Sequence, residues 1–278
     1  MTSFFGVEGE PAPEHVERAR EAKHVIWEGL LRALDHGVPR ASAGALVDAT
    51  YGADVIAAAR EAGVKVAVPV EASGRTELAF EHADWRERLD ALDPAWAKVL
   101  VRYNPEGDEA MNGRQRAALL ELNEHCVRTG RAFMFELLVP PEPHQLLELG
   151  GDRARYDAAV RPALMARAIV ELRADRIAPD VWKIEGLEDR ADCEAIAAVA
   201  GAPCIVLGRG ADTEAVDRWL HAGAGVPGFV GFAIGRSIWW GALRLFFDDK
   251  QRPRGRAAAV ERIAANYRRF VDVYGAAT

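Results

Sequence analysis

Short apolar runs alternate along this chain with longer stretches in which apolar residues recur at helical spacing. This alternation is typical of βα units built around a parallel sheet. Seven apolar runs are predicted to be strands: Gly44 to Asp48, Val64 to Val70, Lys98 to Tyr103, Ala132 to Val139, Asp180 to Glu185, Cys204 to Gly208 and Gly228 to Gly235. Five amphipathic stretches are predicted to be helices: Glu14 to Leu34, Asn112 to Thr129, Arg161 to Asp175, Asp212 to Ala222 and Arg252 to Tyr274.

The length of 278 residues, half of them hydrophobic, is close to the ~250 residues typical of a TIM (β/α)8 barrel. The pattern therefore predicts an α/β fold of this type, with seven of its eight strands recognisable in the sequence. No repeat, low-complexity tract or linker divides the chain. We expect a single barrel domain over residues 1–278.

Charge and composition narrow the class of partner. The net charge is −7, with acidic and basic residues interspersed, so no nucleic-acid or membrane surface is indicated. The three cysteines, Cys126, Cys193 and Cys204, lack Cys-x-x-Cys spacing, which favours core positions in a reducing compartment. Histidine spacing suggests no metal site, and no targeting or membrane segment is evident. We expect a cytoplasmic protein that binds a small molecule without a cofactor.

Lys183 is a lone ammonium within the apolar run from Asp180 to Gly186. Burial can lower a lysine pKa from about 10.4 to about 7 to 8, where the free amine can attack a carbonyl and form a Schiff base. The structural alternative is a lysine at the end of a strand that pairs with Glu185 or extends its amine to water.

Other polar side chains fall within the predicted strands, whose C-terminal ends carry the chemistry of such barrels. Glu136 is a carboxylate in an apolar run, and Lys98 and Arg102 share one face of another strand because side chains alternate. We expect these residues to join Lys183 in a catalytic group. Alternatively, Glu136 forms a purely structural ion pair with Lys98 or Lys183.

Two glycine-arginine segments close the last two predicted strands, Gly208-Arg209-Gly210 and Gly235-Arg236. Glycine lets the backbone approach an anion, and a helix N-terminus supplies N–H donors. Loops at these positions often bind phosphate in TIM barrels, so both segments are predicted to bind the phosphate of a substrate.

Four runs carry a family resemblance: Lys98 to Asp108, Phe133 to Pro140, Asp180 to Gly186 and Gly231 to Ser237. They resemble the domain of unknown function DUF2090, which is fused to the sugar kinase of myo-inositol catabolism and is associated with 2-deoxy-5-keto-gluconate 6-phosphate aldolase. More distantly, the order of motifs is similar to that of class I tagatose-bisphosphate and sulfofructose-phosphate aldolases.

The resemblance implies a class I aldolase in which the residue matching the Schiff-base lysine is Lys183. It implies that Glu136 handles protons, that Lys98 belongs to the site and that Gly235 and Arg236 contact phosphate. It also implies cleavage of 2-deoxy-5-keto-gluconate 6-phosphate to dihydroxyacetone phosphate and malonate semialdehyde. A biosynthetic aldolase, or a catalytically silent barrel that binds sugar phosphates as a scaffold, are the alternatives.

The start of the chain departs from these families, because their first strand ends in an Asp-His-Arg or Asp-Gln-Arg motif that is absent here. Either upstream residues supply that strand or the strand has been lost. An open sheet edge is a liability, so we expect closure by preceding residues or by a second subunit in a homo-oligomer. The apolar Phe4, Phe5 and Val7 are expected to pack against a neighbouring surface, or to cap the floor of the barrel.

Overall fold

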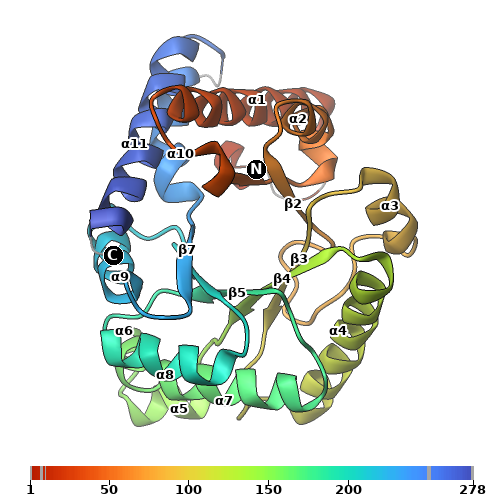
Figure 1. Cartoon of the computed structure of the whole chain (residues 1–278), viewed down its shortest axis with the longest axis vertical. Coiled ribbons are helices and arrows are strands. Elements are labelled where there is room, and N and C mark those ends of the chain that lie inside the picture. The colour runs from red at the N-terminus through yellow and green to blue at the C-terminus, as the bar shows by residue number, and fades with distance from the viewer. Residues whose placement is uncertain (1, 7–8, 10, 249–251, 277–278) are drawn as a thin grey trace.

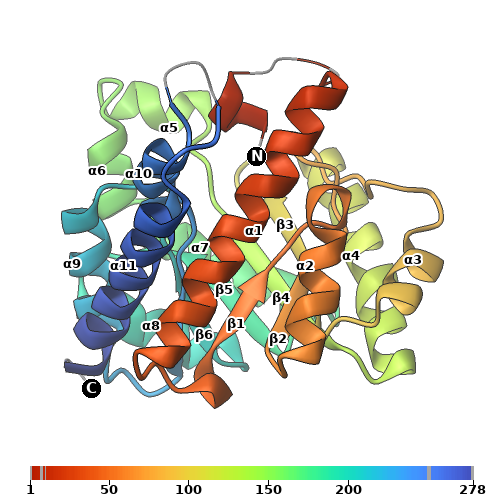
Figure 2. The ribbon, with the colours of Figure 1, turned by 90° about the horizontal axis from the view of Figure 1, so that it is seen from above.

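The computed structural model describes residues 2–6, 9, 11–248 and 252–276. Its seven strands form one parallel sheet in which each strand lies beside its neighbour in the sequence. The strands are β1 (Gly44–Leu46), β2 (Lys65–Pro69), β3 (Trp96–Arg102), β4 (Ala132–Leu138), β5 (Val181–Glu185), β6 (Cys204–Leu207) and β7 (Phe229–Ala233). Every predicted strand is therefore confirmed, and the helices that connect the strands surround the sheet (Figures 1 and 2).

The sheet curves into an incomplete TIM barrel. Within the described residues, β1 pairs with β2 and β7 pairs with β6, but β1 and β7 do not pair with each other. In Figure 1 the first long helix, α1 (Pro13–Asp35), lies along the side between β7 and β2. That helix packs against α11 (Arg256–Ala276). Two helices therefore lie on the side of the barrel where β1 and β7 do not pair.

The remaining helices follow the strands in sequence. They are α2 (Ala49–Glu61), α3 (Trp85–Leu92), α4 (Glu109–Thr129), α5 (Pro143–Glu148), α6 (Arg153–Ala159), α7 (Arg161–Ala174), α8 (Arg190–Ala200), α9 (Thr213–Gly223) and α10 (Arg236–Phe246), with short 3-10 helices η1 (Thr2–Phe5) and η2 (Arg40–Ser42). After β7 the chain forms α10, which packs against α11, and α11 also packs against α1 and α9. No helix in the described part of the chain is long and apolar enough to cross a membrane.

Two predicted helix starts were wrong. The helix expected from Asn112 begins at Glu109, because the Asp108 carboxylate accepts a hydrogen bond from the Met111 amide and caps it. Asn112 is buried inside that helix and donates to a backbone carbonyl. The final helix begins at Arg256 rather than at Arg252. The predicted stop at Gly130 and the predicted start at Asp212 are confirmed.

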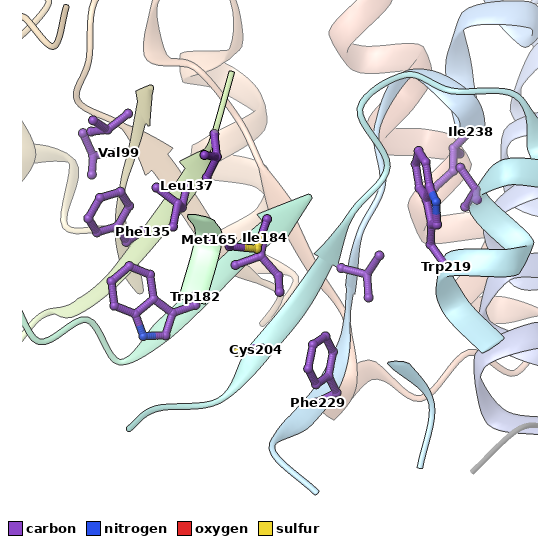
Figure 3. Close-up of a cluster of buried hydrophobic side chains, with 14 of the residues drawn as sticks. Val99, Phe135, Leu137, Met165, Trp182, Ile184, Cys204, Trp219, Phe229 and Ile238 are labelled. Atoms are coloured by element: carbon purple, nitrogen blue, oxygen red, sulfur yellow. The ribbon is translucent and has the colours of Figure 1, made fainter. Parts of the chain in front are cut away.

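The hydrophobic core lies mainly between the sheet and the helices. Trp182 is fully buried, and its indole N–H donates to the Ala200 carbonyl of α8 at 3.0 Å. The Phe135 ring lies beside it at a tilt of 32°, with the ring centroids 4.9 Å apart. Figure 3 labels both residues. The three cysteines are buried and free, as expected of core positions. Since side chains alternate along a strand, the residues that follow Trp182 on β5 and Phe135 on β4 face the barrel interior.

The N-terminal segment packs against α10. Phe4 contacts Trp240 edge-on at 5.1 Å, and Phe5, which is buried, contacts Phe247 at 5.1 Å. The expectation that these aromatic residues lie against a neighbouring surface is confirmed, and that surface belongs to the same chain. Val7 lies outside the described residues.

The close contact between α1 and α11 predicts a stability effect. A Cβ atom at Gly29 would lie 2.3 Å from Ile263 Cγ2 and 2.6 Å from its Cβ. We expect Gly29→Ala to lower the free energy of unfolding by about 1–3 kcal/mol through overpacking, measured by urea denaturation. Gly113→Ala on α4, where the nearest atom is 3.7 Å away, is the control and is expected to raise it by about 0.5–1 kcal/mol. Equal effects of the two substitutions would contradict tight packing.

Candidate active site

Four charged side chains meet in the barrel interior, in an alternating row of Glu71, Lys98, Glu136 and Lys183, called here the ionic row. The two lysines bind the same oxygen of one carboxylate: Glu136 Oε2 lies 2.7 Å from Lys98 Nζ and 3.0 Å from Lys183 Nζ. Glu71 Oε1 extends the row at 2.5 Å from Lys98 Nζ. The structure thus brings together three residues predicted from sequence and adds a fourth.

Strand register explains this meeting. Glu136 on β4 pairs with Leu100 on β3 and with Lys183 on β5. Lys98 lies two residues before Leu100 and therefore shares its inward face. The Trp182 side chain faces the helices. Lys183, the next residue on β5, therefore faces the interior, where Glu136 is the adjacent carboxylate.

The ionic row is almost entirely removed from water. Lys98 is 4% exposed, and Glu136 and Lys183 are each 5% exposed. Burial lowers the pKa of Lys183, and the nearby Lys98 charge adds to this, against the opposing effect of Glu136. Burial also disfavours the charge on Lys98, but Glu71 and Glu136 outweigh it and raise the pKa of Lys98. Two equally buried lysines are thus shifted in opposite directions.

The two carboxylates of the ionic row are also shifted in opposite directions. Burial acts on Glu136, but the two ammonium groups prevail and lower its pKa. Burial raises the pKa of Glu71, with Lys98 opposing the shift. The inner pair, Lys98 and Glu136, is therefore held ionised, whereas the outer residues are shifted towards their neutral forms.

Glu71 was not predicted from the sequence. It directly follows the apolar run that ends at Val70, and this position at the end of a strand was the available signal. A short loop holds it: Glu71 forms an antiparallel bridge with Phe80, and the Ala72 amide donates to the Ala79 carbonyl at 2.8 Å. Residues 71–78 of this loop line a pocket together with Leu100 and Arg102.

Arg102 occupies the rim of that pocket rather than the ionic row. It shares the inward face of β3 with Lys98, as predicted, but its guanidinium donates to the Arg75 carbonyl at 2.7 Å. Its proposed contribution to catalysis therefore depends on a substrate that reaches the loop.

The two predicted phosphate segments lie side by side at the ends of β6 and β7. Arg236 Nη2 donates to the Arg209 carbonyl at 2.7 Å, and Ser237 Oγ donates to the Ala211 carbonyl at 2.7 Å. Gly235 precedes the first turn of α10, where the leading N–H groups have no acceptor within the helix. Gly208 ends β6 beside Ile234 of the neighbouring loop.

Backbone conformation favours glycine at position 210. The backbone there has a φ of 75°, and a Cβ would lie 2.5 Å from Arg236 Cζ. Arg209 also has a positive φ, of 50°. The loop therefore turns through two left-handed residues before reaching α9.

The side chain of Arg209 is engaged within the protein. Its Nε lies 3.1 Å from Glu185 Oε1, and its Nη1 lies 2.9 Å from Asp157 Oδ2. Glu185 also accepts the Val139 amide at 2.8 Å and lies 3.9 Å from the buried Arg161. The suggested pairing of Lys183 with Glu185 was wrong, because consecutive inward positions on β5 serve different ionic groups.

Metal ligation is not indicated in this region. Among the described residues, no group of three or more histidine, cysteine, aspartate or glutamate side chains is arranged to hold a metal ion.

Comparison with known proteins identifies the family. The model of the family described as "Uncharacterized protein conserved in bacteria (DUF2090)" matches residues 7–278, and the chain belongs to this family. The resemblance noted in the sequence is therefore confirmed at the level of the family. No curated protein matches the sequence.

Solved structures share the fold at low identity. Cgl0159 from Corynebacterium glutamicum is 16% identical, with a TM-score of 0.59 over 87% of this chain and 76% of that chain. A Schiff-base-forming fructose-1,6-bisphosphate aldolase is 16% identical, with a TM-score of 0.50 over 87% and 99%. The YdjI aldolase from Escherichia coli K12 is 12% identical, with a TM-score of 0.57 over 90% and 87%. These similarities support the incomplete TIM barrel.

The shared carboxylate predicts a large stability effect. Glu136→Gln would remove the carboxylate that the buried Lys98 and Lys183 share, so the free energy of unfolding at neutral pH should fall by about 3–5 kcal/mol in urea denaturation. The control is Glu77→Gln, which removes an exposed pair with Arg114 and should cost less than about 1 kcal/mol. A loss at position 136 as small as that of the control would show that Glu136 does not hold the row together.

Proposed function

We propose that this member of the DUF2090 family is a lyase of the class I aldolase type, in which Lys183 forms a Schiff base with the carbonyl of a phosphorylated keto sugar. The observation that carries the proposal is the ionic row: a buried lysine with a lowered pKa whose single carboxylate partner is shared with a second lysine. Such an amine loses its proton more readily than an ordinary lysine, and the free amine is a nucleophile.

The choice of basic residue supports this chemistry. The chain contains only five lysines among its 35 lysines and arginines: Lys23, Lys65, Lys98, Lys183 and Lys250. Two of these five meet at Glu136. Arginine satisfies a buried carboxylate well but is not deprotonated in proteins, whereas lysine can be. Lysine at both positions, in a chain that otherwise favours arginine, indicates that proton loss matters here.

The proposed cleavage proceeds through an iminium ion. The free amine of Lys183 adds to the ketone and water leaves, so that a C=N⁺ bond replaces the carbonyl. Glu136 accepts the proton of the β-hydroxyl, directly or through water, while the adjacent carbon–carbon bond breaks and its electron pair moves into the iminium to give an enamine. Protonation of the enamine carbon and hydrolysis release the second product and regenerate Lys183. Lys98 supports negative charge on the substrate oxygen.

The loops after β6 and β7 support a phosphorylated substrate. Arg236, the leading N–H groups of α10 and the glycine at position 210 together offer charge, donors and close backbone access. The side chain of Arg209 is held by two carboxylates, so we assign phosphate contact to Arg236 and to the Gly208, Gly210 and Gly235 backbone. This arrangement follows the common phosphate site of TIM barrels.

The substrate is proposed from the family resemblance. The best match is 2-deoxy-5-keto-gluconate 6-phosphate, cleaved to dihydroxyacetone phosphate and malonate semialdehyde in the cytoplasm. The structural neighbours include a Schiff-base-forming aldolase, in line with this reaction class. Addition and cleavage share one enamine, so a biosynthetic direction uses the same residues. The interrupted strand ladder between β7 and β1 favours the second candidate, a silent sugar-phosphate-binding scaffold.

Covalent trapping tests the nucleophile. Incubation with dihydroxyacetone phosphate and borohydride should add the reduced adduct to Lys183, and Lys183→Met should abolish it. Because burial lowers the pKa of Lys183 from 10.5, the trapping rate should rise with pH and level off below that value. The measurement is peptide mass spectrometry across a pH series. An adduct on the exposed Lys65 alone, or phosphate-ester binding without any adduct, would favour the silent scaffold.

Substitution at the rim tests phosphate binding. Arg236→Lys replaces a two-pronged guanidinium donor by a point charge and should weaken binding of phosphate esters by about 1–3 kcal/mol, measured calorimetrically. The control is Arg244→Lys in the last turn of the same helix, which should leave the affinity unchanged. If Arg236→Lys behaves like its control, Arg236 is a structural cation of the rim.

A further inference from the structure

The ionic row contains two candidate nucleophiles. Lys98 and Lys183 are 4% and 5% exposed, and both bind Glu136 Oε2. Equal burial and a common partner give neither lysine an advantage in holding its proton. Some other group therefore has to determine which amine is free.

Glu71 is the group that distinguishes them. Its Oε1 lies 2.5 Å from Lys98 Nζ, so among the described residues Lys98 has two carboxylate partners and Lys183 has one. The other oxygen, Glu71 Oε2, is buried and has no hydrogen-bond partner among the described residues. Within the ionic row, Glu71 therefore contacts Lys98, through Oε1.

We propose that Glu71 selects the nucleophile: held between two carboxylates, Lys98 keeps its proton, and Lys183, which shares one carboxylate with a permanent cation, is the amine that becomes free. Glu71 acts through Lys98 and is thus a positioning residue. The consequence for catalysis rests on the proposed function, but the selection itself is a property of the ionic row.

The electrostatic surroundings agree with the geometry. The charged groups near Glu71 are Lys98 and Arg102 on β3, Glu136 on β4, and Arg75 and Glu77 in its own loop. The pKa of Lys98 is raised, with Glu71 the largest favourable influence, whereas the pKa of Lys183 is lowered. Since burial raises the pKa of Glu71, its hold on Lys98 should weaken as the pH falls through that pKa.

Selection gives Lys98 a defined part in the reaction. A lysine that stays protonated cannot compete for the carbonyl, and it remains a cation next to the atom where oxygen charge develops. Without Glu71, the two lysines would compete for one carboxylate, and both would be partly deprotonated.

Reductive methylation of the intact folded protein tests the proposal without a sugar substrate. A short pulse of formaldehyde and cyanoborohydride modifies free amines, and peptide mass spectrometry measures the ratio of modification at Lys183 to that at Lys98, with the exposed Lys65 as reference. We expect Lys183 to be modified and Lys98 to be spared in the native chain. Loss of a charge-assisted hydrogen bond in Glu71→Gln should lower the ratio at least about tenfold.

Two variants serve as controls. Glu71→Asp retains the charge and should retain most of the selectivity, and Glu194→Gln, which removes an exposed pair with Arg190 on α8, should leave the ratio unchanged. An unchanged ratio in Glu71→Gln overturns the proposal, as does equal modification or sparing of both lysines in the native chain. If Glu71→Gln does not fold, as judged by circular dichroism, the native chain is methylated at decreasing pH over the whole range in which it stays folded. The ratio should then fall as Glu71 is protonated, and a ratio that is constant over that range overturns the proposal.

The probe separates this inference from the proposed function. Formaldehyde needs neither a phosphate site nor carbon–carbon cleavage. Selective methylation of Lys183 without any dihydroxyacetone phosphate adduct would remove the aldolase proposal and leave the selection by Glu71 intact. A sugar-phosphate adduct at Lys183, together with an unchanged methylation ratio in Glu71→Gln, would support the aldolase proposal and overturn the selection by Glu71.

Discussion

One oxygen of Glu136 binds two ammonium groups inside the barrel, and the candidate site depends on this shared contact. A buried ion is costly unless it is paired, and a buried lysine that loses its partner gives up its proton instead. Glu136 is the shared counter-ion of Lys98 and Lys183. This sharing keeps the buried ionic row paired, but Lys183 has no carboxylate of its own among the described residues. The reactivity we propose for Lys183 follows from that unequal division.

The apolar faces of the same strands make the contact possible. Trp182 and Phe135 fix β5 and β4 against the helices, and the alternation of side chains then directs Lys183 and Glu136 inwards at paired positions. A shift of one residue in either strand would bury the charges among the helices and expose the aromatic rings to the interior. Packing between the sheet and the helices therefore sets the geometry of the ionic row. On the side where β1 and β7 do not pair, α1 and α11 pack against each other.

Much of this arrangement could be predicted from the sequence. Short apolar runs defined the seven strands, and charged residues within three of these runs identified Lys98, Glu136 and Lys183. The partners were harder to predict, because pairing depends on register and loop closure rather than on local pattern. Glu71 lies 27 positions before Lys98 and reaches it through the bridge to Phe80. Arg209 was predicted to bind phosphate because its loop suits anions, and its ion pairs with Glu185 and Asp157, which are distant in the sequence, could not be predicted from that loop.

Strand β5 links the two halves of the site. Lys183 and Glu185 are consecutive inward positions, separated by roughly 7 Å along the strand. Lys183 belongs to the ionic row, whereas Glu185 binds Arg209, whose carbonyl accepts the Arg236 guanidinium. One repeat of the strand and two polar contacts therefore separate the proposed nucleophile, Lys183, from the loop that we propose to bind phosphate. Under this proposal a substrate held at both ends must fit that span, so the spacing would select for chain length, and we assign recognition of the end away from the phosphate to Arg102 and the 71–78 loop.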